Sequence, residues 1–243
     1  MNAQPPQRRF LVCCISLLFS AIAYADKGAS KNVILIIGDG FDDQHVTMGR
    51  NYLAGMSGML TLDKLPFRGA VQVETFSAAG QPVYVADSAN TATAIATGAI
   101  TSIGRVGTDI QDRDLPTIAE QAIASGLRVG LVTTSSITDA TPASFLTHVS
   151  SRSCEGPEEI LGSSYYGVPQ PTCPQDALQN NGPGSIIEQL AVSGAHVLFG
   201  GGEKFLGQIT ARGESVRSLA ERNGLHVLTE PDELKNLPTH QAV

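Results

Sequence analysis

Asp87 and Ser88 stand at the head of an alanine- and threonine-rich stretch, Ser88 to Thr97, that favours a helix. Backbone N–H groups are free at the start of a helix, and the helix dipole favours an anion there. A serine in this place can attack phosphorus, and the same N–H groups would hold its phosphoserine product. The alternative is a plain N-cap serine, which is the commoner role. The G-x-S-x-G elbow of serine hydrolases is absent, so nothing supports an acyl-transfer triad.

Asp39 is a second candidate, and it lies in the turn Gly38-Asp39-Gly40 after an apolar run. The turn is close to a dinucleotide-binding fingerprint but lacks its third glycine. A carboxylate there would repel a pyrophosphate unless a cation intervened. Asp39 therefore suits a metal ligand, although an aspartate that only caps a turn fits the motif equally well.

Asp139, Thr141 and Arg152 form a third group, after another predicted strand. The oxygens of Asp139 and Thr141 suit Mg²⁺, directly or through water. The planar fork of Arg152 can bind two oxygens of a phosphate. Each residue alone is more commonly solvated or a cap. Their occurrence in one chain with Asp39 and Ser88 favours a phosphate site that contains metal.

The elements that would position these residues alternate between strands and helices. The pattern predicts strands at 32–37, 69–77, 128–136 and 195–202, and helices at 42–55, 88–97, 115–126 and 184–194. The apolar runs at 32–37 and 128–136 are typical of buried parallel strands. This order indicates an α/β fold with a mostly parallel sheet. Because sites in such sheets form where strands end, we expect the candidate residues to meet there.

The composition fits a globular protein and argues against one class of partner. Of 243 residues, 42% are hydrophobic and 16% are charged. The formal charge is -7 and no run of Lys or Arg stands out, so no nucleic-acid partner is expected.

The N-terminus is typical of an export signal. Arg8 and Arg9 precede a short apolar core, and Ala23-Tyr24-Ala25 fits a cleavage site, so residues 1–25 are predicted to be a signal peptide. A membrane anchor is the alternative, but the apolar run is short for a span. We therefore expect a periplasmic or secreted protein with no stable membrane span after cleavage.

Two cysteines remain after such cleavage, Cys154 and Cys173, in the polar stretch 150–184. An even pair in an oxidising compartment favours a disulfide, which would hold this surface excursion. A zinc site is the alternative, but the two thiols have no histidine partner nearby.

Several long motifs together resemble the bacterial-type alkaline phosphatases. They run in the family's order from about residue 32 to about residue 202: GDGFDDQHVTMGRNYLAG, VADSANTATAIATG, and the stretch from GTDIQDRDLP to THVSSR with the cysteine-bracketed segment after it. The resemblance implies that residues 26–243 are the N-terminal part of an alkaline phosphatase domain. Its fold would be an α/β three-layer sandwich with a mostly parallel central sheet, incomplete at the C-terminus, and the full-length protein would be a homodimer.

The resemblance also implies two Zn²⁺ and one Mg²⁺ as cofactors. Asp39 would bridge a zinc and the magnesium, and Ser88 would bind that zinc. Thr141 would contact the magnesium, with Asp139 acting on it through water.

For catalysis, the resemblance implies two-step hydrolysis of phosphate monoesters. Ser88 would be the nucleophile that becomes phosphorylated, Arg152 would clamp the phosphate, and Asp87 would orient Arg152. The metals and the arginine carry most of the stabilisation in phosphoryl transfer.

The chain departs from the family in its zinc ligands, most of which come from the family's C-terminal half. No histidine here lies in a matching ligand motif, so one zinc keeps only Asp39 and Ser88 and the other has no ligand. A fragment inactive alone is therefore expected. The alternatives are a non-catalytic truncated product that binds phosphate or metal, and a related sulfatase or phosphodiesterase, which Ser88 in place of Cys or Thr disfavours.

Overall fold

The computed structural model describes residues 32–162, 164–165 and 167–237. The chain divides into two units, residues 1–38 and residues 39–243. The signal peptide predicted for residues 1–25 lies outside the described residues.

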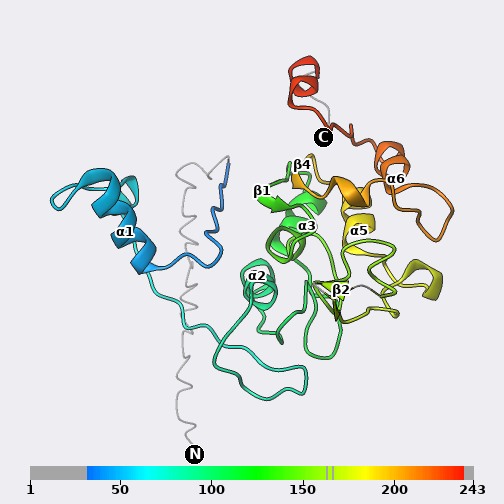
Figure 1. The fold of residues 1–243 in the computed structure, drawn as a ribbon, viewed down its shortest axis with the longest axis horizontal. Coiled ribbons are helices and arrows are strands. Elements are labelled where there is room, and N and C mark those ends of the chain that lie inside the picture. The colour runs from blue at the N-terminus through cyan, green and yellow to red at the C-terminus, as the bar shows by residue number, and fades with distance from the viewer. Residues whose placement is uncertain (1–31, 163, 166, 238–243) are drawn as a thin grey trace, which may run out of the picture. The chain divides into compact units, whose positions relative to one another are not determined.

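Short helices carry much of the regular structure (Figure 1). The α-helices are α1 (Asp43–Ala54), α2 (Ser88–Thr97), α3 (Ile118–Ala124), α4 (Ala140–Ala143), α5 (Ile186–Val192) and α6 (Val216–Arg222). Short 3-10 helices cover Thr61–Lys64, Leu178–Asn180, Glu203–Phe205 and Pro231–Asn236. Within the described ranges, no helix has both the length and the apolar character needed to cross a membrane.

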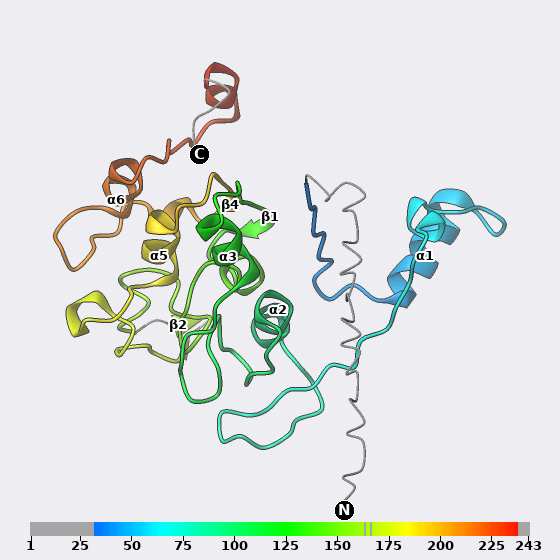
Figure 2. The same cartoon turned by 180° about the vertical axis from the view of Figure 1, so that it is seen from behind.

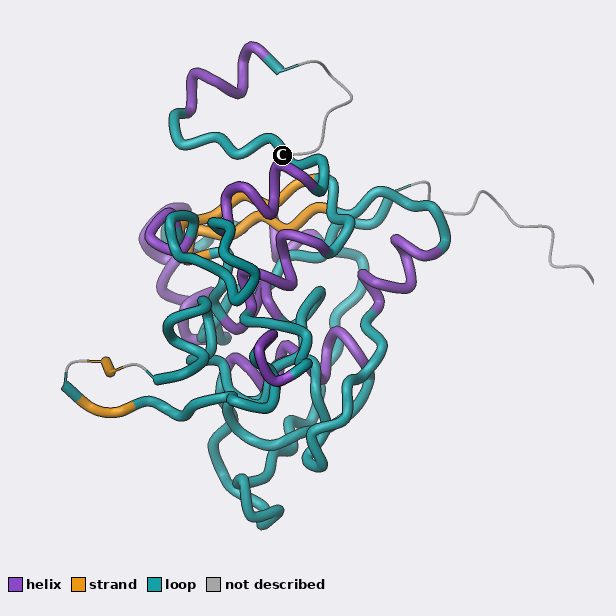
Figure 3. The backbone as a smooth tube through the Cα atoms, turned by 90° about the vertical axis from the view of Figure 1, so that its right-hand side faces the viewer, coloured by secondary structure: helices purple, strands orange, loops and turns teal. Residues whose placement is uncertain are grey.

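Two parallel strands, β1 (Gly130–Ser136) and β4 (Val197–Gly201), lie side by side in Figures 1 and 2 and again in the quarter-turned view of Figure 3. A separate antiparallel pair joins β2 (Ser164–Tyr165) and β3 (Val168–Pro169). Helix α3 precedes β1, and α4 and α5 lie between β1 and β4 in the chain. The α/β fold with a parallel sheet is thus confirmed, although the sheet is small and incomplete.

The four predicted helices are present, and their caps explain their bounds. Asp42 caps α1 with its side chain, and Asp87 caps α2. Gly98 adopts a left-handed conformation (φ 75°) and ends α2, as a glycine can at little cost. Thr117 caps α3, so Pro116 precedes the cap and does not lie in the first turn.

The strand predicted at 32–37 is wrong. Residues 32–38 have no regular structure, and Val33 and Ile36 expose 86% and 87% of their surface. An apolar run of this kind is buried in a parallel sheet only when layers cover both of its faces. Each of the two sheets among the described residues has two strands, so neither offers such a setting.

The strand predicted at 69–77 is also wrong. Val71 and Val73 are exposed, and Phe76 makes only isolated bridges. The strand predicted at 128–136 is present as β1, but it is not buried throughout, because Val132 is 74% exposed. The alternation of apolar and polar residues and the β-branched side chains therefore predicted strands in these segments. The described residues supply too few pairing partners for most of them.

Helices α2 and α4 pack together through small side chains. The packed alanines are at most 2% exposed: Ala89, Ala92 and Ala96 of α2, and Ala140 and Ala143 of α4. Between the helices, Ser144 Oγ accepts a hydrogen bond from Thr93 Oγ1 at 3.3 Å. Small residues let two helix backbones approach closely, which brings residues at the start of α2 near those at the start of α4.

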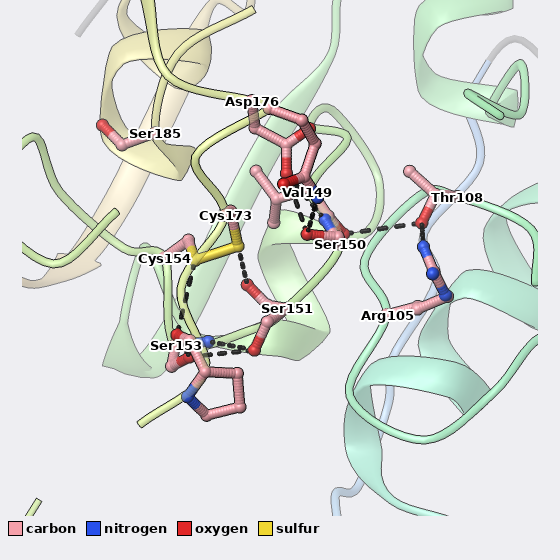
Figure 4. Close-up of a disulfide and its surroundings, with 12 residues drawn as sticks. Arg105, Thr108, Val149, Ser150, Ser151, Ser153, Cys154, Cys173, Asp176 and Ser185 are labelled. Carbon is pink, nitrogen blue, oxygen red and sulfur yellow. Dashed lines mark hydrogen bonds between the residues drawn. A yellow bond between two sulfur atoms is a disulfide. The ribbon is translucent and has the colours of Figure 1, made fainter. Parts of the chain in front are cut away.

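A disulfide joins Cys154 and Cys173, as favoured from the sequence (Figure 4). Both cysteines are buried. Ser151 and Ser153 lie beside the bridge in Figure 4, with their hydroxyl oxygens 2.8 Å apart. The disulfide therefore anchors the segment that carries Arg152.

A candidate phosphate and metal site

Asp39 brings two hydroxyl side chains together from distant parts of the chain. Ser88 Oγ donates to Asp39 Oδ1 at 2.9 Å, and Thr141 Oγ1 donates to Asp39 Oδ2 at 2.9 Å. Asp39 is exposed, while Ser88 and Thr141 are half-buried. Three residues singled out in the sequence thus meet at one open carboxylate.

Arg152 connects two further candidates. Its Nη2 donates to Asp139 Oδ1 at 2.8 Å and its Nη1 to Asp87 Oδ2 at 3.4 Å. The arginine side chain is 35% exposed, so the fork stays accessible from solvent. The backbone helps to place it, because Arg152 N donates to Gly104 O at 2.7 Å and Gly104 N donates to Asp87 Oδ1 at 3.2 Å.

The local sequence explains why these carboxylates lie where they do. Asp87 is the N-cap of α2, and its Oδ1 accepts from Asn90 N at 3.0 Å while Asn90 Oδ1 accepts from Asp87 N at 2.9 Å. Asp139 is the N-cap of α4, and its Oδ1 accepts from Ala140 N at 2.9 Å. Ser88 is the first residue of α2, so the capping role considered for it belongs to Asp87.

Two residues of this arrangement were missed in the sequence. Asn90 completes the reciprocal cap of α2, and its three-residue spacing from Asp87 was a usable signal. Ser135 donates from Oγ to Asp139 Oδ2 at 2.5 Å, and no motif marks this contact.

The charge of Asp139 is held by its neighbours. Partial burial alone would raise the pKa of the Asp139 carboxyl. Hydrogen bonds from Ser135 and from the backbone of Ala140, together with the positive charge of Arg152, outweigh burial and lower that pKa. Asp139 therefore remains a carboxylate well into the acidic range.

The donor set fits part of a metal centre. The oxygens of Asp39, Thr141 and Asp139 are the hard ligands that Mg²⁺ prefers. Zinc takes about four nitrogen, sulfur or oxygen donors. Among the described residues, no three His, Cys, Asp or Glu side chains gather in a way that could hold a metal. The donors that the site does present are oxygens, which suit a hard cation.

A pocket of about 670 Å³ lies elsewhere, against α5, α6 and the end of β4. Its lining is mainly apolar and includes Leu190, Phe199, Leu225 and Val227. None of the candidate site residues lines it, so its volume does not belong to the phosphate site.

Known proteins resemble most of this chain. The sequence model of the alkaline phosphatase family matches residues 30–233. Alkaline phosphatase of Escherichia coli (strain K12) is 40% identical over 223 residues, which cover 88% of this chain and 44% of the relative. Streptomycin-6-phosphate phosphatase of Streptomyces griseus is 38% identical over 242 residues, covering 94% and 52%.

A solved structure supports the same likeness. The cold-active alkaline phosphatase of the psychrophile Shewanella sp. superposes with a TM-score of 0.60 at 27% identity, covering 83% of this chain and 42% of that one. The chain spans about half the length of the curated relatives it matches.

Proposed function

This chain belongs to the alkaline phosphatase family, and on that premise we propose that it supplies Ser88 and Arg152 to the metal-dependent hydrolysis of phosphate monoesters. The observation that carries the proposal is the convergence on Asp39. Ser88 and Thr141 share its carboxylate, while Asp87, next to Ser88, contacts Arg152. These contacts gather the proposed nucleophile, the oxygen ligands and the phosphate-binding guanidinium near the starts of α2 and α4.

In the proposed reaction, Ser88 Oγ gives up its proton to solvent and forms a bond to phosphorus as the bond from phosphorus to the ester oxygen breaks. The leaving oxygen takes the bonding electron pair, gains a proton from solvent and departs as the alcohol. A water oxygen then loses a proton and bonds to phosphorus, Ser88 Oγ leaves and regains a proton, and inorganic phosphate is released. Formation of a covalent intermediate divides one difficult displacement into two easier ones.

The chain's own residues bind and orient in both steps. Asp39 accepts the hydrogen bond of the Ser88 hydroxyl and so directs its oxygen. The free N–H groups at the start of α2 and the guanidinium of Arg152 can donate hydrogen bonds to the phosphate oxygens. Asp87 and Asp139 hold that fork.

Alkaline phosphatases are metal-dependent, and we assign the finer detail as follows. Asp39 would hold both Zn²⁺ and Mg²⁺, Ser88 would bind the Zn²⁺ and Thr141 the Mg²⁺, and Asp139 would act on the Mg²⁺ through water. When bound, these cations would lower the pKa of the attacking hydroxyl and offset charge on the transferred group. The shared carboxylate of Asp39 supports this assignment because it already collects two of the other ligands.

The test is to trap the covalent intermediate. The full-length protein that contains this chain is incubated with Zn²⁺, Mg²⁺ and p-nitrophenyl phosphate, then quenched in acid, and its peptides are analysed by mass spectrometry. A phosphoryl group is expected on the peptide with Ser88, and it should be absent from Ser88→Ala. Ser125→Ala, an exposed change at the residue that follows α3, should label like the native protein. Equal labelling of Ser88→Ala would remove Ser88 as the nucleophile.

A second candidate function is phosphate or metal binding without turnover. The observation that favours it is the guanidinium of Arg152, which is 35% exposed and can bind phosphate oxygens without any turnover. Calorimetry on the same preparation separates the two functions, because binding of inorganic phosphate without alcohol release supports the second. Comparing aryl phosphate with aryl sulfate hydrolysis tests the less favoured sulfatase function.

The proposed setting is the periplasm or the outside of the cell, with the full-length protein as a homodimer acting on small phosphate monoesters. The Cys154–Cys173 disulfide supports an oxidising compartment. N-terminal sequencing of the exported protein would reveal cleavage after residue 25. Analytical sedimentation of the full-length protein would reveal the dimer.

A further inference from the structure

We propose that Ser135 is a positioning residue of this site. Its hydroxyl fixes the carboxylate of Asp139, and Asp139 holds Arg152 in the orientation that receives phosphate. The inference rests on the proposed function, because it assigns Arg152 to the phosphate.

The contacts of Asp139 show what Ser135 adds. Asp139 Oδ1 accepts from Ala140 N at 2.9 Å and from Arg152 Nη2 at 2.8 Å. Asp139 Oδ2 accepts from Ser135 Oγ at 2.5 Å. Without the serine hydroxyl, both remaining bonds fall on one oxygen, and the carboxylate is free to tilt about it. The second oxygen is therefore fixed by Ser135.

The distances also show that Asp139 is the closer anchor of Arg152. The bond that Arg152 donates to Asp139 is 2.8 Å long, a normal charge-assisted length, whereas the bond that it donates to Asp87 is 3.4 Å long and correspondingly weaker. A tilt of Asp139 would thus move Arg152 more than the same change at Asp87.

The end of β4 holds Ser135 in place. Ser136 pairs with Gly201, and Ile137 N donates to Gly201 O at 2.9 Å. A Cβ added to Gly200 would lie 3.1 Å from Ser135 O and 2.7 Å from Thr133 Cγ2. The two strand ends therefore approach so closely that the Ser135 backbone has little freedom.

The role of Ser135 is separable from folding. The residue is exposed, and its hydroxyl bonds to Asp139 and to no other partner in the described part of the chain. Loss of the hydroxyl removes no core packing and leaves no buried polar group unsatisfied. A stable Ser135→Ala chain is expected.

The experiment uses the full-length protein that contains this chain, and compares its native form with Ser135→Ala, Ser135→Thr, Arg152→Ala and the control Ser125→Ala. The affinity for inorganic phosphate is measured by calorimetry with saturating Mg²⁺ and Zn²⁺. A single lost hydrogen bond of about 1 kcal/mol predicts roughly fivefold weaker binding in Ser135→Ala. Ser135→Thr keeps the hydroxyl and should restore the native affinity. Circular dichroism confirms that each variant is folded.

A second readout needs neither metal nor phosphate. Rotation of the Arg152 guanidinium about its Cζ–N bonds is followed by ¹⁵N NMR of the metal-free chain. Rotation should be faster in Ser135→Ala than in the native chain and in Ser135→Thr. A purely structural role for Ser135 would leave this rate unchanged.

The outcomes distinguish the two proposals. Native affinity and native guanidinium rotation in Ser135→Ala, with weakened binding in Arg152→Ala, overturn the inference and leave the proposed function standing. Weak binding in both Ser135→Ala and Ser135→Thr also overturns it, because the hydroxyl is then not the cause. Unchanged binding in Arg152→Ala, or no phosphate binding by the native chain, overturns the proposed function itself.

Discussion

Asp87 and Asp139 each serve two kinds of partner at once. Each caps a helix through a backbone N–H, and each accepts a hydrogen bond from Arg152. One side chain can therefore cap a helix and contact Arg152 at the same time. Both roles use the same carboxylate, since its oxygens can accept several bonds.

The ion pair between His148 and Glu120 makes the free energy of unfolding depend on pH. His148 Nε2 lies 2.8 Å from Glu120 Oε1, and His148 Nδ1 lies 2.8 Å from Gly107 O. Burial alone would lower the pKa of His148, but Glu120, Gly107 and the charge of Asp114 raise it above the ordinary 6.5. Burial likewise opposes the lowered pKa of Glu120, which His148 and Thr117 hold below the ordinary 4.5.

The pair should thus stabilise the chain fully between pH 4.5 and pH 6.5. Its contribution is lost as pH rises through the raised pKa of His148, and also as pH falls through the lowered pKa of Glu120. We expect urea unfolding midpoints to fall from about pH 5.5 to about pH 8.5, and to fall less in His148→Gln. His226→Gln changes an exposed histidine and should keep the native difference. Equal pH dependence in His148→Gln and the native chain would contradict this.

Because the ends of β1 and β4 lie so close together, a side chain at Gly200 should destabilise the chain. Gly200 does not have a positive φ, so only crowding opposes a side chain there. The Cβ of Gly200→Ala would lie 2.7 Å from Thr133 Cγ2 and 3.0 Å from Ile137 N, and overpacking of this kind costs about 1–3 kcal/mol. Urea unfolding should show this loss.

The matched control is Gly207→Ala, where an added Cβ meets nothing within 4 Å. It should be neutral or slightly stabilising. Adding Thr133→Ser to Gly200→Ala removes the crowded methyl group and should restore part of the loss. A Gly200→Ala chain as stable as Gly207→Ala would show that the strand ends separate easily.

The helices were predictable from sequence because their signals are local. Asp87 and Gly98 mark the two ends of α2 within one short stretch. The strands were harder, since pairing depends on distant residues, and the runs at 32–37 and 69–77 are not strands in the structure. The residue types of the candidate site were likewise readable, but the sharing of Asp39 and the contact from Ser135 follow from packing between distant elements.

For the whole chain, the disulfide is expected to contribute strongly to stability. Cys154 and Cys173 are 19 residues apart, and closing a loop of this size stabilises by roughly 3 kcal/mol in the chain-entropy estimate. The double variant Cys154→Ala/Cys173→Ala should lose about this free energy of unfolding. Reduction by dithiothreitol should bring the native chain to the same value and leave the variant unchanged. If dithiothreitol left the free energy of unfolding of the native chain unchanged, the prediction would be wrong.

The pairing of one arginine with two aspartates has a thermodynamic consequence. Asp39, Asp87 and Asp139 bring three negative charges to a place where Arg152 brings one positive charge. An incoming phosphate dianion therefore meets an excess of its own sign unless divalent cations are present. Cation and phosphate should each increase the affinity for the other, and by linkage they do so by the same factor. The site would then respond to the two solutes jointly and remain largely empty when either is scarce.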